Sequence, residues 1–382
     1  MTTQSMEIRM VDTIAQYNLI KDEVDAAVAE VISSGAYING PAVKRFTASL
    51  KEYLGAKAVI PCANGTDALQ IALMALDLEP GDEVITSPFT FFATAEVIAL
   101  LGLIPVFVDV DPKTFNIDPS KIEAAITPKT KCIIPVHLFG QPSDMESIME
   151  IATRRKLWVV EDNAQAIGSN YTFKDGRTEK AGMIGHIGCT SFYPSKNLGA
   201  YGDAGAIFTN DEALGEKLLM ICNHGSRKRY FHERIGVNSR LDSIQGAILD
   251  VKLGHLDRYN GSREAAASKY DELLGGVEGI EIPKRTSNTT HVFHQYTLLI
   301  SEGRERRDRL QAQLAELKIP SMVYYPVPLH EQEAYAPYGF KKGDFPVSES
   351  LSEMVISLPM HSELNTAQIE YIVQNLLACY HQ

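Results

Sequence analysis

Short apolar runs alternate with segments of helical periodicity through the first half of the chain. The apolar runs lie at residues 57–61, 83–86, 104–108, 132–136 and 157–160, and helical segments between them lie at 92–101, 119–125 and 143–154. Strands joined in sequence by helices predict a mostly parallel sheet with helices on both faces. Such an α/β fold places its ligands at the carboxyl edge of the sheet, so the side chains that follow the strands are the site candidates.

A carboxylate and a lysine stand out among these candidates. Asp162 closely follows the apolar run at 157–160, where a buried strand would deliver it to the carboxyl edge. Lys196 lies in a turn-forming segment, after the strand-like run at 189–192 and before a glycine-rich turn at 202–205. A lysine held out of water at such a turn has a lowered pKa and can act as a nucleophile.

The pair predicts a chemistry that neither residue predicts alone. A lysine near glycines is usually a loop residue, and an aspartate at a strand end is often only a helix cap. Together they suit an aldehyde cofactor, pyridoxal phosphate (PLP), because the amine can form a Schiff base with it and the acid can hold its ring nitrogen protonated. We therefore predict PLP as the cofactor and Lys196 and Asp162 as the catalytic residues.

The segments around these two residues resemble a family signature. Glu161-Asp-Asn-Ala-Gln-Ala-Ile-Gly168, followed by Ser191-Phe-Tyr-Pro-Ser-Lys196, resembles that of the DegT/DnrJ/StrS family of PLP-dependent nucleotide-sugar aminotransferases. The resemblance extends from about Tyr37 to Pro359. It implies fold type I of the PLP-dependent enzymes, in which a large domain with a mostly parallel central sheet between helices is followed by a smaller C-terminal α/β domain.

The chain is expected to divide near Gly254. One amphipathic helix is predicted over residues 13–33, another helix over 242–253, and a long helix from Leu256 that leads out of the first domain. We assign residues 1–254 to the large PLP-binding domain and 255–382 to the small domain. In the small domain, strands at 279–282 and 292–300 alternate with helices at 304–317 and 366–380.

A phosphate site is predicted where the first strand turns into a helix. The segment 63–69 makes this turn, and the first backbone N–H groups of a helix have no partner within it. By itself the turn could be a simple helix cap. The resemblance implies that Gly65 and Thr66 bind the cofactor phosphate and that the hydroxyl of Ser191 adds a further donor.

The pyridine ring needs a flat apolar face, and three phenylalanines follow the second strand. On the residues alone Phe89, Phe91 or Phe92 would serve equally well. The resemblance implies that Phe91 stacks on the ring. It also implies that Gln165, three residues after Asp162, hydrogen-bonds the phenolic oxygen of the cofactor.

The most basic part of the chain lies between residues 223 and 242. A charged run of this kind is normally a solvated loop. The resemblance implies instead that the segment crosses the interface of a homodimer, where Asn238 binds the phosphate of the neighbouring subunit's cofactor. Arg240 would also act in the neighbouring site, where its planar guanidinium could clamp a carboxylate. A monomer would then lack a complete site.

Four further residues are predicted to contact the substrate. Asn39 precedes a Gly-Pro turn that the resemblance places at the substrate mouth, although an ordinary turn between helices is equally compatible with the sequence. Tyr324, Tyr325 and His330 belong to an aromatic, proline-stiffened segment that resembles the family's substrate loop. The chain departs from the family pattern at Tyr324, where a histidine is expected.

The predicted reaction is the transfer of an amino group from L-glutamate to a nucleotide-linked keto-sugar in surface polysaccharide biosynthesis. Segments 64–70 and 236–242 resemble family members that aminate C3 of UDP-2-acetamido-2-deoxy-3-keto-glucuronate. Segments 191–203 and 343–347 equally suit those that aminate C3 of dTDP-3-keto-6-deoxyhexoses. We predict the UDP sugar, whose carboxylate Arg240 could bind, and keep the dTDP sugar as the alternative. A non-catalytic sensor or assembly protein with the same fold is the alternative of another class, but it would be expected to lack the lysine or the aspartate.

Composition limits the partners and the compartment. The formal net charge is −12, which argues against a nucleic-acid-binding surface because phosphate contacts require clustered lysine and arginine. The sequence contains no run of 18 apolar residues, so no membrane span is expected. The amino-terminal residues do not resemble a secretory signal. The five cysteines have no paired spacing, so buried free thiols, a cytoplasmic location and no metal site are expected.

Overall fold

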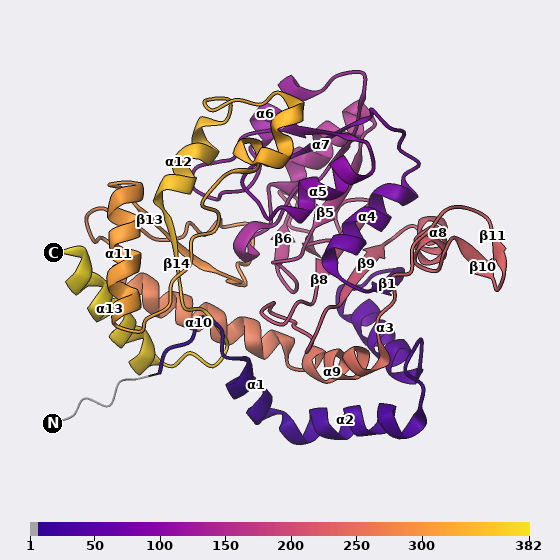
Figure 1. Cartoon of the computed structure of the whole chain (residues 1–382), viewed down its shortest axis with the longest axis horizontal. Coiled ribbons are helices and arrows are strands. Elements are labelled where there is room, and N and C mark those ends of the chain that lie inside the picture. Colours follow the sequence, from indigo (N-terminus) through magenta and orange to yellow (C-terminus); the bar gives the residue numbers. More distant parts are fainter. Residues whose placement is uncertain (1–6) are drawn as a thin grey trace.

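The computed structural model describes residues 7–382 and contains a seven-stranded central sheet (Figure 1). The strand order is β1-β9-β8-β5-β4-β2-β3, and only β9 runs antiparallel to its neighbours. The strands are β1 (Ala58–Cys62), β2 (Glu83–Thr86), β3 (Ile104–Phe107), β4 (Thr130–Ile133), β5 (Trp158–Asp162), β8 (Ile187–Ser191) and β9 (Gly205–Thr209). The predicted mostly parallel α/β sheet is confirmed.

Helices cover both faces of this sheet because its strands are apolar on both sides. Successive strand residues point to opposite faces, so Val160 packs with α4 and α8 whereas Val159 packs with α6 and α7. The helices connected with this sheet are α3 (Pro41–Leu54), α4 (Gly65–Ala75), α5 (Ala93–Leu100), α6 (Pro119–Ala125), α7 (Met145–Arg155), α8 (Glu212–Cys222) and α9 (Ser243–Leu253). This arrangement leaves the carboxyl edge of the parallel strands available for a site.

The predicted single helix over residues 13–33 is wrong, because the segment forms two helices. α1 (Thr13–Leu19) ends before Ile20, whose φ of −125° and ψ of 18° are not helical, and α2 (Lys21–Ser34) follows. The break allows Ile20 and Val24 to pack together against Ile248 of α9. Burial of these side chains therefore outweighs the helical continuity that the apolar spacing alone predicts.

A second sheet of three antiparallel strands lies toward the C-terminus (Figure 1). Its strands are β12 (Ile280–Glu281), β13 (Tyr296–Ile300) and β14 (Val355–Leu358), and its helices are α10 (Leu256–Leu274), α11 (Arg304–Glu316), α12 (Pro346–Met354) and α13 (Thr366–Tyr380). Residues near the N-terminus join this part, since Ile8 belongs to its core and Met10 O accepts a hydrogen bond from Met360 N. The division at residue 254 stays a prediction.

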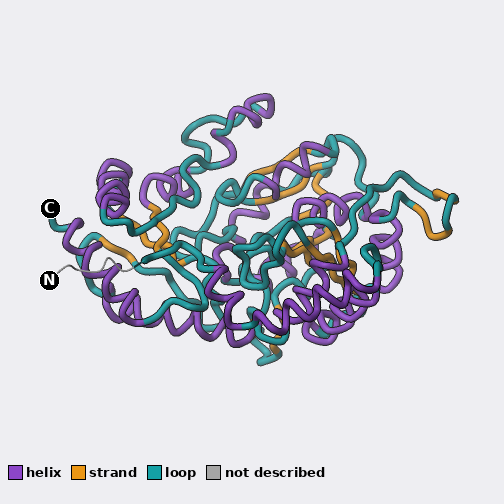
Figure 2. Tube along the Cα trace, turned by 60° about the horizontal axis from the view of Figure 1, so that its bottom comes forward, coloured by secondary structure: helices purple, strands orange, loops and turns teal. Residues whose placement is uncertain are grey.

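Three short helices, η1 (Leu138–Gly140), η2 (Leu329–Glu331) and η3 (Glu333–Tyr338), connect these elements, and two small hairpins lie outside the main sheets. β6 (Asn170–Thr172) pairs with β7 (Thr178–Lys180), and β10 (Ser226–Lys228) pairs with β11 (Phe231–His232). The β10–β11 hairpin projects from the body in both views (Figures 1 and 2). Among residues 7–382, no helix is both long enough and apolar enough to cross a bilayer.

Candidate active site

A cavity of about 760 Å³ lies where β5 and β8 end, at the carboxyl edge of the central sheet. It brings together nine residues that the sequence singled out. These are Gly65, Thr66, Phe91, Asp162, Gln165, Ser191, Lys196, Tyr324 and Tyr325. They come from distant parts of the chain: Gly65 begins α4, whereas Tyr324 and Tyr325 follow β12 and β13 of the C-terminal sheet.

Asp162 is held at the end of β5 with its carboxylate directed by two donors. Oδ2 accepts a hydrogen bond from Thr94 Oγ1 at 2.8 Å, and Oδ1 accepts one from Ala164 N at 3.2 Å. Burial raises the pKa of Asp162, while these two hydrogen bonds and the Lys196 ammonium favour the ionised form. The side chain is only 6% exposed, so a group that pairs with it must enter the cavity.

Lys196 faces the same cavity from the loop that follows β8. Burial lowers the pKa of its amine to about 8, with the charge of Asp162 acting in the opposite direction. The loop is anchored next to the lysine, since Asn197 Nδ2 donates to Val292 O at 2.8 Å and to Asn260 Oδ1 at 2.7 Å. An amine of this pKa is substantially neutral in mildly alkaline solution and can then act as a nucleophile.

The predicted phosphate turn begins α4 next to the end of β8. Asn64 caps the helix, and its side-chain oxygen accepts a hydrogen bond from Asp67 N at 2.8 Å. A Cβ atom at Gly65 would lie only 2.6 Å from Ser191 Cβ, so a larger residue would push the two segments apart. The first N–H groups of α4 and the Ser191 hydroxyl therefore lie close enough to serve one anion.

The structure distinguishes the three phenylalanines. Phe89 is buried in the core, and Phe92 packs against Tyr335 with ring centroids 5.5 Å apart. Phe91 lines the cavity and is 59% exposed. Of the three, it is the one whose ring is free to stack on a ligand, although its role stays a prediction.

Gln165 and Tyr325 close one side of the cavity together. Gln165 Oε1 accepts a hydrogen bond from Phe139 N at 2.7 Å, so its Nε2 faces the Tyr325 hydroxyl at 3.2 Å. Burial raises the pKa of Tyr325, which keeps this phenol neutral and able to donate. The contact joins the end of the central sheet to the segment that precedes η2.

Two buried side chains, the Glu161 carboxylate and the His137 imidazole, hydrogen-bond each other next to Asp162. Glu161 accepts hydrogen bonds from the backbone N–H groups of Gly182, Ile184 and Gly185, and its Oε2 lies 2.7 Å from His137 Nε2. Because Ser143 N donates to His137 Nδ1 at 3.1 Å, the imidazole proton is on Nε2 and is directed at Glu161. His137 is thus a satisfied structural histidine.

Comparison with known proteins identifies the family. The DegT/DnrJ/EryC1/StrS aminotransferase family matches residues 18–377. The chain belongs to this aminotransferase family. The predicted resemblance to DegT/DnrJ/StrS proteins is therefore confirmed.

Individual relatives cover almost the whole chain. A "pleiotropic regulatory protein" of Geobacillus stearothermophilus is 48% identical over 98% of this chain and 99% of its own length. The UDP-2-acetamido-2-deoxy-3-oxo-D-glucuronate aminotransferase of Pseudomonas aeruginosa is 46% identical over 96% of this chain and 98% of its own. The crystal structure of DesV from S. venezuelae, in complex with a ketimine intermediate, has a TM-score of 0.93 at 39% identity and covers 98% of this chain and 99% of its own.

Three predicted site residues of this DegT/DnrJ/EryC1/StrS protein lie outside the cavity. Asn39 and Arg240 line a second hollow of about 900 Å³, beside the β10–β11 hairpin. Asn238 pairs with Asn223 in a backbone bridge next to the same hollow. Within one chain these residues are not brought to Lys196 and Asp162.

His330 also lies apart from the cavity lining. Its side chain is buried in η2, and Nε2 lies 3.0 Å from Glu349 Oε1. The same carboxylate oxygen accepts a hydrogen bond from Gly343 N at 2.6 Å. These contacts fasten η2 to the turn before α12, and a direct contact of His330 with substrate stays a prediction.

Sequence reasoning missed several residues at the site, among them Thr94 and His294. Thr94 was detectable, since it lies only three residues after Phe91 in the segment that follows β2. His294, which lines the cavity, had no such signal because it precedes β13 far along the chain. Burial and the Lys196 charge lower the pKa of His294 well below its usual value, so its imidazole is neutral.

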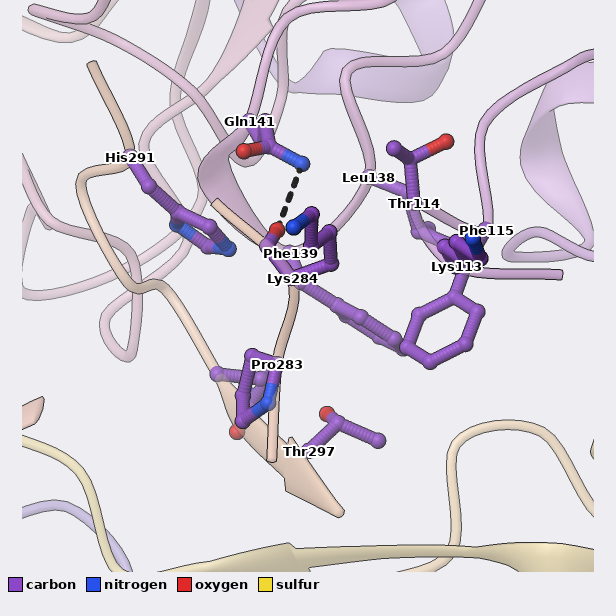
Figure 3. A pocket seen from close by; sticks show the side chains of 11 residues that line it. Lys113, Thr114, Phe115, Leu138, Phe139, Gln141, Pro283, Lys284, His291 and Thr297 are labelled. Carbon is purple, nitrogen blue, oxygen red and sulfur yellow. Dashed lines mark hydrogen bonds between the residues drawn. The ribbon is translucent and has the colours of Figure 1, made fainter. Parts of the chain in front are cut away.

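A much smaller pocket adjoins the cavity, with Phe139 and Gln295 lining both. Figure 3 shows the side chains around it, including Gln141, whose Nε2 donates to Lys284 O at 3.1 Å. Its volume of about 10 Å³ is barely enough to hold one water molecule, so this pocket cannot hold a sugar.

Proposed function

We propose that this chain transfers an amino group from L-glutamate to C3 of UDP-2-acetamido-2-deoxy-3-keto-glucuronate, for surface polysaccharide synthesis in the cytoplasm. The observation that carries this proposal is the joint presence of Lys196 and Asp162 in one cavity of an aminotransferase fold. The five buried free thiols are compatible with a reducing compartment. The 46% identity to the Pseudomonas enzyme favours the UDP-linked sugar.

The residues present fit PLP, the cofactor of this aminotransferase. Asp162 is a buried carboxylate in the cavity lining that could pair with the ring nitrogen, and the exposed ring of Phe91 could stack on the pyridine. Gly65, Thr66 and Ser191 form an anion cradle at the start of α4 for the phosphate. PLP, when bound, supplies an electron sink for the charge that develops as the substrate carbon loses its proton.

The protein's own part in the reaction is to hold charges and move one proton. Asp162, whose ionised form Thr94 and Ala164 N favour, would pair with the ring nitrogen. With its amine free and neutral, Lys196 Nζ would accept the proton from Cα of the amino donor and could release it at the carbon on the other side of the amino nitrogen. Gln165 and Tyr325 close one side of the site with their hydrogen bond.

The pKa of Lys196 sets a pH dependence for cofactor attachment. The amine is protonated and unreactive well below its pKa of about 8 and neutral above it. We expect the rate at which PLP attaches to the apoprotein to rise as the pH increases through about 8 and then level off. Stopped-flow absorbance at fixed PLP concentration measures this rate, and a rate that is independent of pH from 6 to 10 would contradict the role given to Lys196.

The sugar can be identified by a direct competition. Purified protein loaded with PLP is given L-glutamate and either the UDP-linked 3-keto-glucuronate or a dTDP-3-keto-6-deoxyhexose, and 2-oxoglutarate is measured. We expect turnover of the UDP sugar. Turnover of the dTDP sugar alone would overturn the proposed substrate and leave the aminotransferase assignment intact.

A catalyst can also be separated from a regulator with the same fold. Bound PLP gives a visible absorbance band, and an active aminotransferase bleaches it when it accepts the amino group of glutamate. We expect this bleaching for the wild-type protein in the absence of any sugar. A band that persists with glutamate and with other amino acids would favour the non-catalytic alternative.

We further propose that two copies of the chain complete each other's sites. Asn39, Asn238 and Arg240 gather at the second hollow, away from Lys196. Beside it, the projecting hairpin exposes Tyr230 and Phe231, which are 77% and 62% exposed. Exposed aromatic side chains on a projecting arm are typical of an interface between subunits.

Mixing two defective variants tests the shared site. Lys196→Ala and Arg240→Ala are each expected to be poorly active alone. If Arg240 acts in the neighbouring subunit, a randomly mixed dimer concentrates both defects in one site and leaves the other intact, so about a quarter of the wild-type activity should return. Recovery of no activity, with mixed dimers verified by a tag on one variant, would place Arg240 in its own subunit's site.

A further inference from the structure

Two threonine hydroxyls form a chain of hydrogen bonds that ends on Asp162. Thr94 Oγ1 lies 2.8 Å from Asp162 Oδ2, and an ionised carboxylate has no proton to give, so Thr94 donates. Thr90 Oγ1 lies 3.3 Å from Thr94 Oγ1. Because the Thr94 proton is already directed at the carboxylate, Thr90 must be the donor in this second contact.

Both threonines are buried in the turn that presents Phe91. Each is 1% exposed, and Thr94 N donates to Phe91 O at 3.3 Å in the first turn of α5. A hydrogen bond from a hydroxyl to a charged group is strengthened in such a water-poor environment. The turn thus couples the residue predicted to cover the ring face to the acid predicted to hold the ring nitrogen.

We propose that Thr94 is the positioning residue that orients Asp162, and that Thr90 orients the Thr94 hydroxyl. The proposal rests on the proposed function, in which Asp162 pairs with the cofactor nitrogen. Thr94 holds one carboxylate oxygen while Ala164 N holds the other, and the two bonds together fix the plane of the carboxylate. Without Thr94 the carboxylate can rotate about its last bond and loses its alignment with the ring.

The charge of Asp162 gives this proposal a second readout. The Thr94 hydroxyl favours the ionised form, so its removal should raise the pKa of Asp162 further above its usual value. The other titratable groups near this carboxyl come from several segments of the chain. They are Glu161 on the same strand, His137 before η1, Cys189 on β8, Lys196 in the following loop and Tyr325 before η2.

A matched pair of variants tests the hydroxyl without changing the size of the side chain. Thr94→Val replaces the hydroxyl by a methyl group, whereas Thr94→Ser keeps the hydroxyl and removes the methyl group. We expect Thr94→Val to weaken PLP binding to the apoprotein by about 10- to 100-fold, the factor for a lost hydrogen bond to a charged group. Thr94→Ser should bind within about threefold of wild type. Equilibrium titration of the apoproteins, followed by protein fluorescence, measures both affinities.

The pH profile separates positioning from a purely structural effect. In Thr94→Val, the acidic limb of kcat/KM should shift to higher pH, because Asp162 is protonated more easily. The limb should stay in place in Thr94→Ser. Thr90→Val should show a smaller loss of PLP affinity than Thr94→Val, because it removes only the more distant bond.

Several outcomes would overturn the proposal. Equal PLP affinity in Thr94→Val and wild type, or equal losses in Thr94→Val and Thr94→Ser, would show that the hydroxyl does not position Asp162. A loss in Thr90→Val as large as that in Thr94→Val would contradict the order of the chain. If Thr94→Val does not fold, Thr94→Ala compared with Thr94→Ser decides the same question. Failure of the wild-type protein to bind PLP would instead refute the proposed function.

Discussion

Replacement of Lys196 by alanine is expected to lower kcat by about 10²- to 10⁴-fold, the usual contribution of a general acid–base. Lys196 is the amine that lines the cavity next to Asp162 and has a pKa lowered to about 8. Without it, no side chain at that position can accept the proton from the donor carbon. PLP should still bind, because the phosphate cradle and Asp162 remain, but it should no longer be attached covalently.

Lys252 provides the control for this variant. It is also fully buried, and burial lowers the pKa of its amine to about 7, but Nζ donates to Gly199 O and does not line the cavity. Lys252→Met should lower the melting temperature, because it removes the hydrogen bond to Gly199 O, and should keep PLP covalently bound, whereas Lys196→Ala should lose the covalent attachment. A small amine such as methylamine should restore part of the activity of Lys196→Ala. Activity of Lys196→Ala within tenfold of wild type would refute the assigned role.

The second large effect is expected for Asp162→Asn. This change removes the charge while keeping the shape: the amide oxygen can still accept from Ala164 N, and the amide nitrogen can donate to the Thr94 hydroxyl after that hydroxyl rotates. The ring nitrogen then loses its anionic partner. We expect kcat/KM to fall by about 150- to 5,000-fold, corresponding to the roughly 3–5 kcal/mol of an unpaired buried charge.

The stability of Asp162→Asn separates this loss from unfolding. Burial raises the pKa of Asp162, so a neutral amide at this position should leave the apoprotein as stable as wild type or more stable. Melting temperatures of the apoproteins check this expectation. A variant that retains more than a tenth of the wild-type kcat/KM would show that the charge of Asp162 is not needed.

The order of the elements and the Lys196–Asp162 pair could be predicted from the sequence, because both depend on local patterns. Each strand before Asp162 overlaps a short apolar run, and Asp162 and Lys196 each lie within a few residues of the end of such a run. A parallel sheet places the carboxyl ends of its strands at one edge, and in the structure β5 and β8 are neighbours there. The fold class of this part follows from alternation alone.

Features that depend on contacts between distant segments were beyond this reasoning. Nothing local shows that β9 runs antiparallel between β1 and β8, or that α1 ends at Ile20 to meet α9. Phe91 could not be chosen over Phe89 without knowing which of the two rings is buried in the core. His294 reaches the cavity from a segment almost 100 residues beyond Lys196, and its place could not be read from spacing.

The measurement that tests the central claim most directly is the position at which PLP is attached. The wild-type protein is incubated with PLP, reduced with borohydride, digested, and mapped by mass spectrometry. The modified peptide is expected to contain Lys196 and to be absent when glutamate is added before reduction. Attachment to another lysine such as Lys252, or no attachment at all, would contradict the claim that Lys196 and Asp162 form the cofactor site.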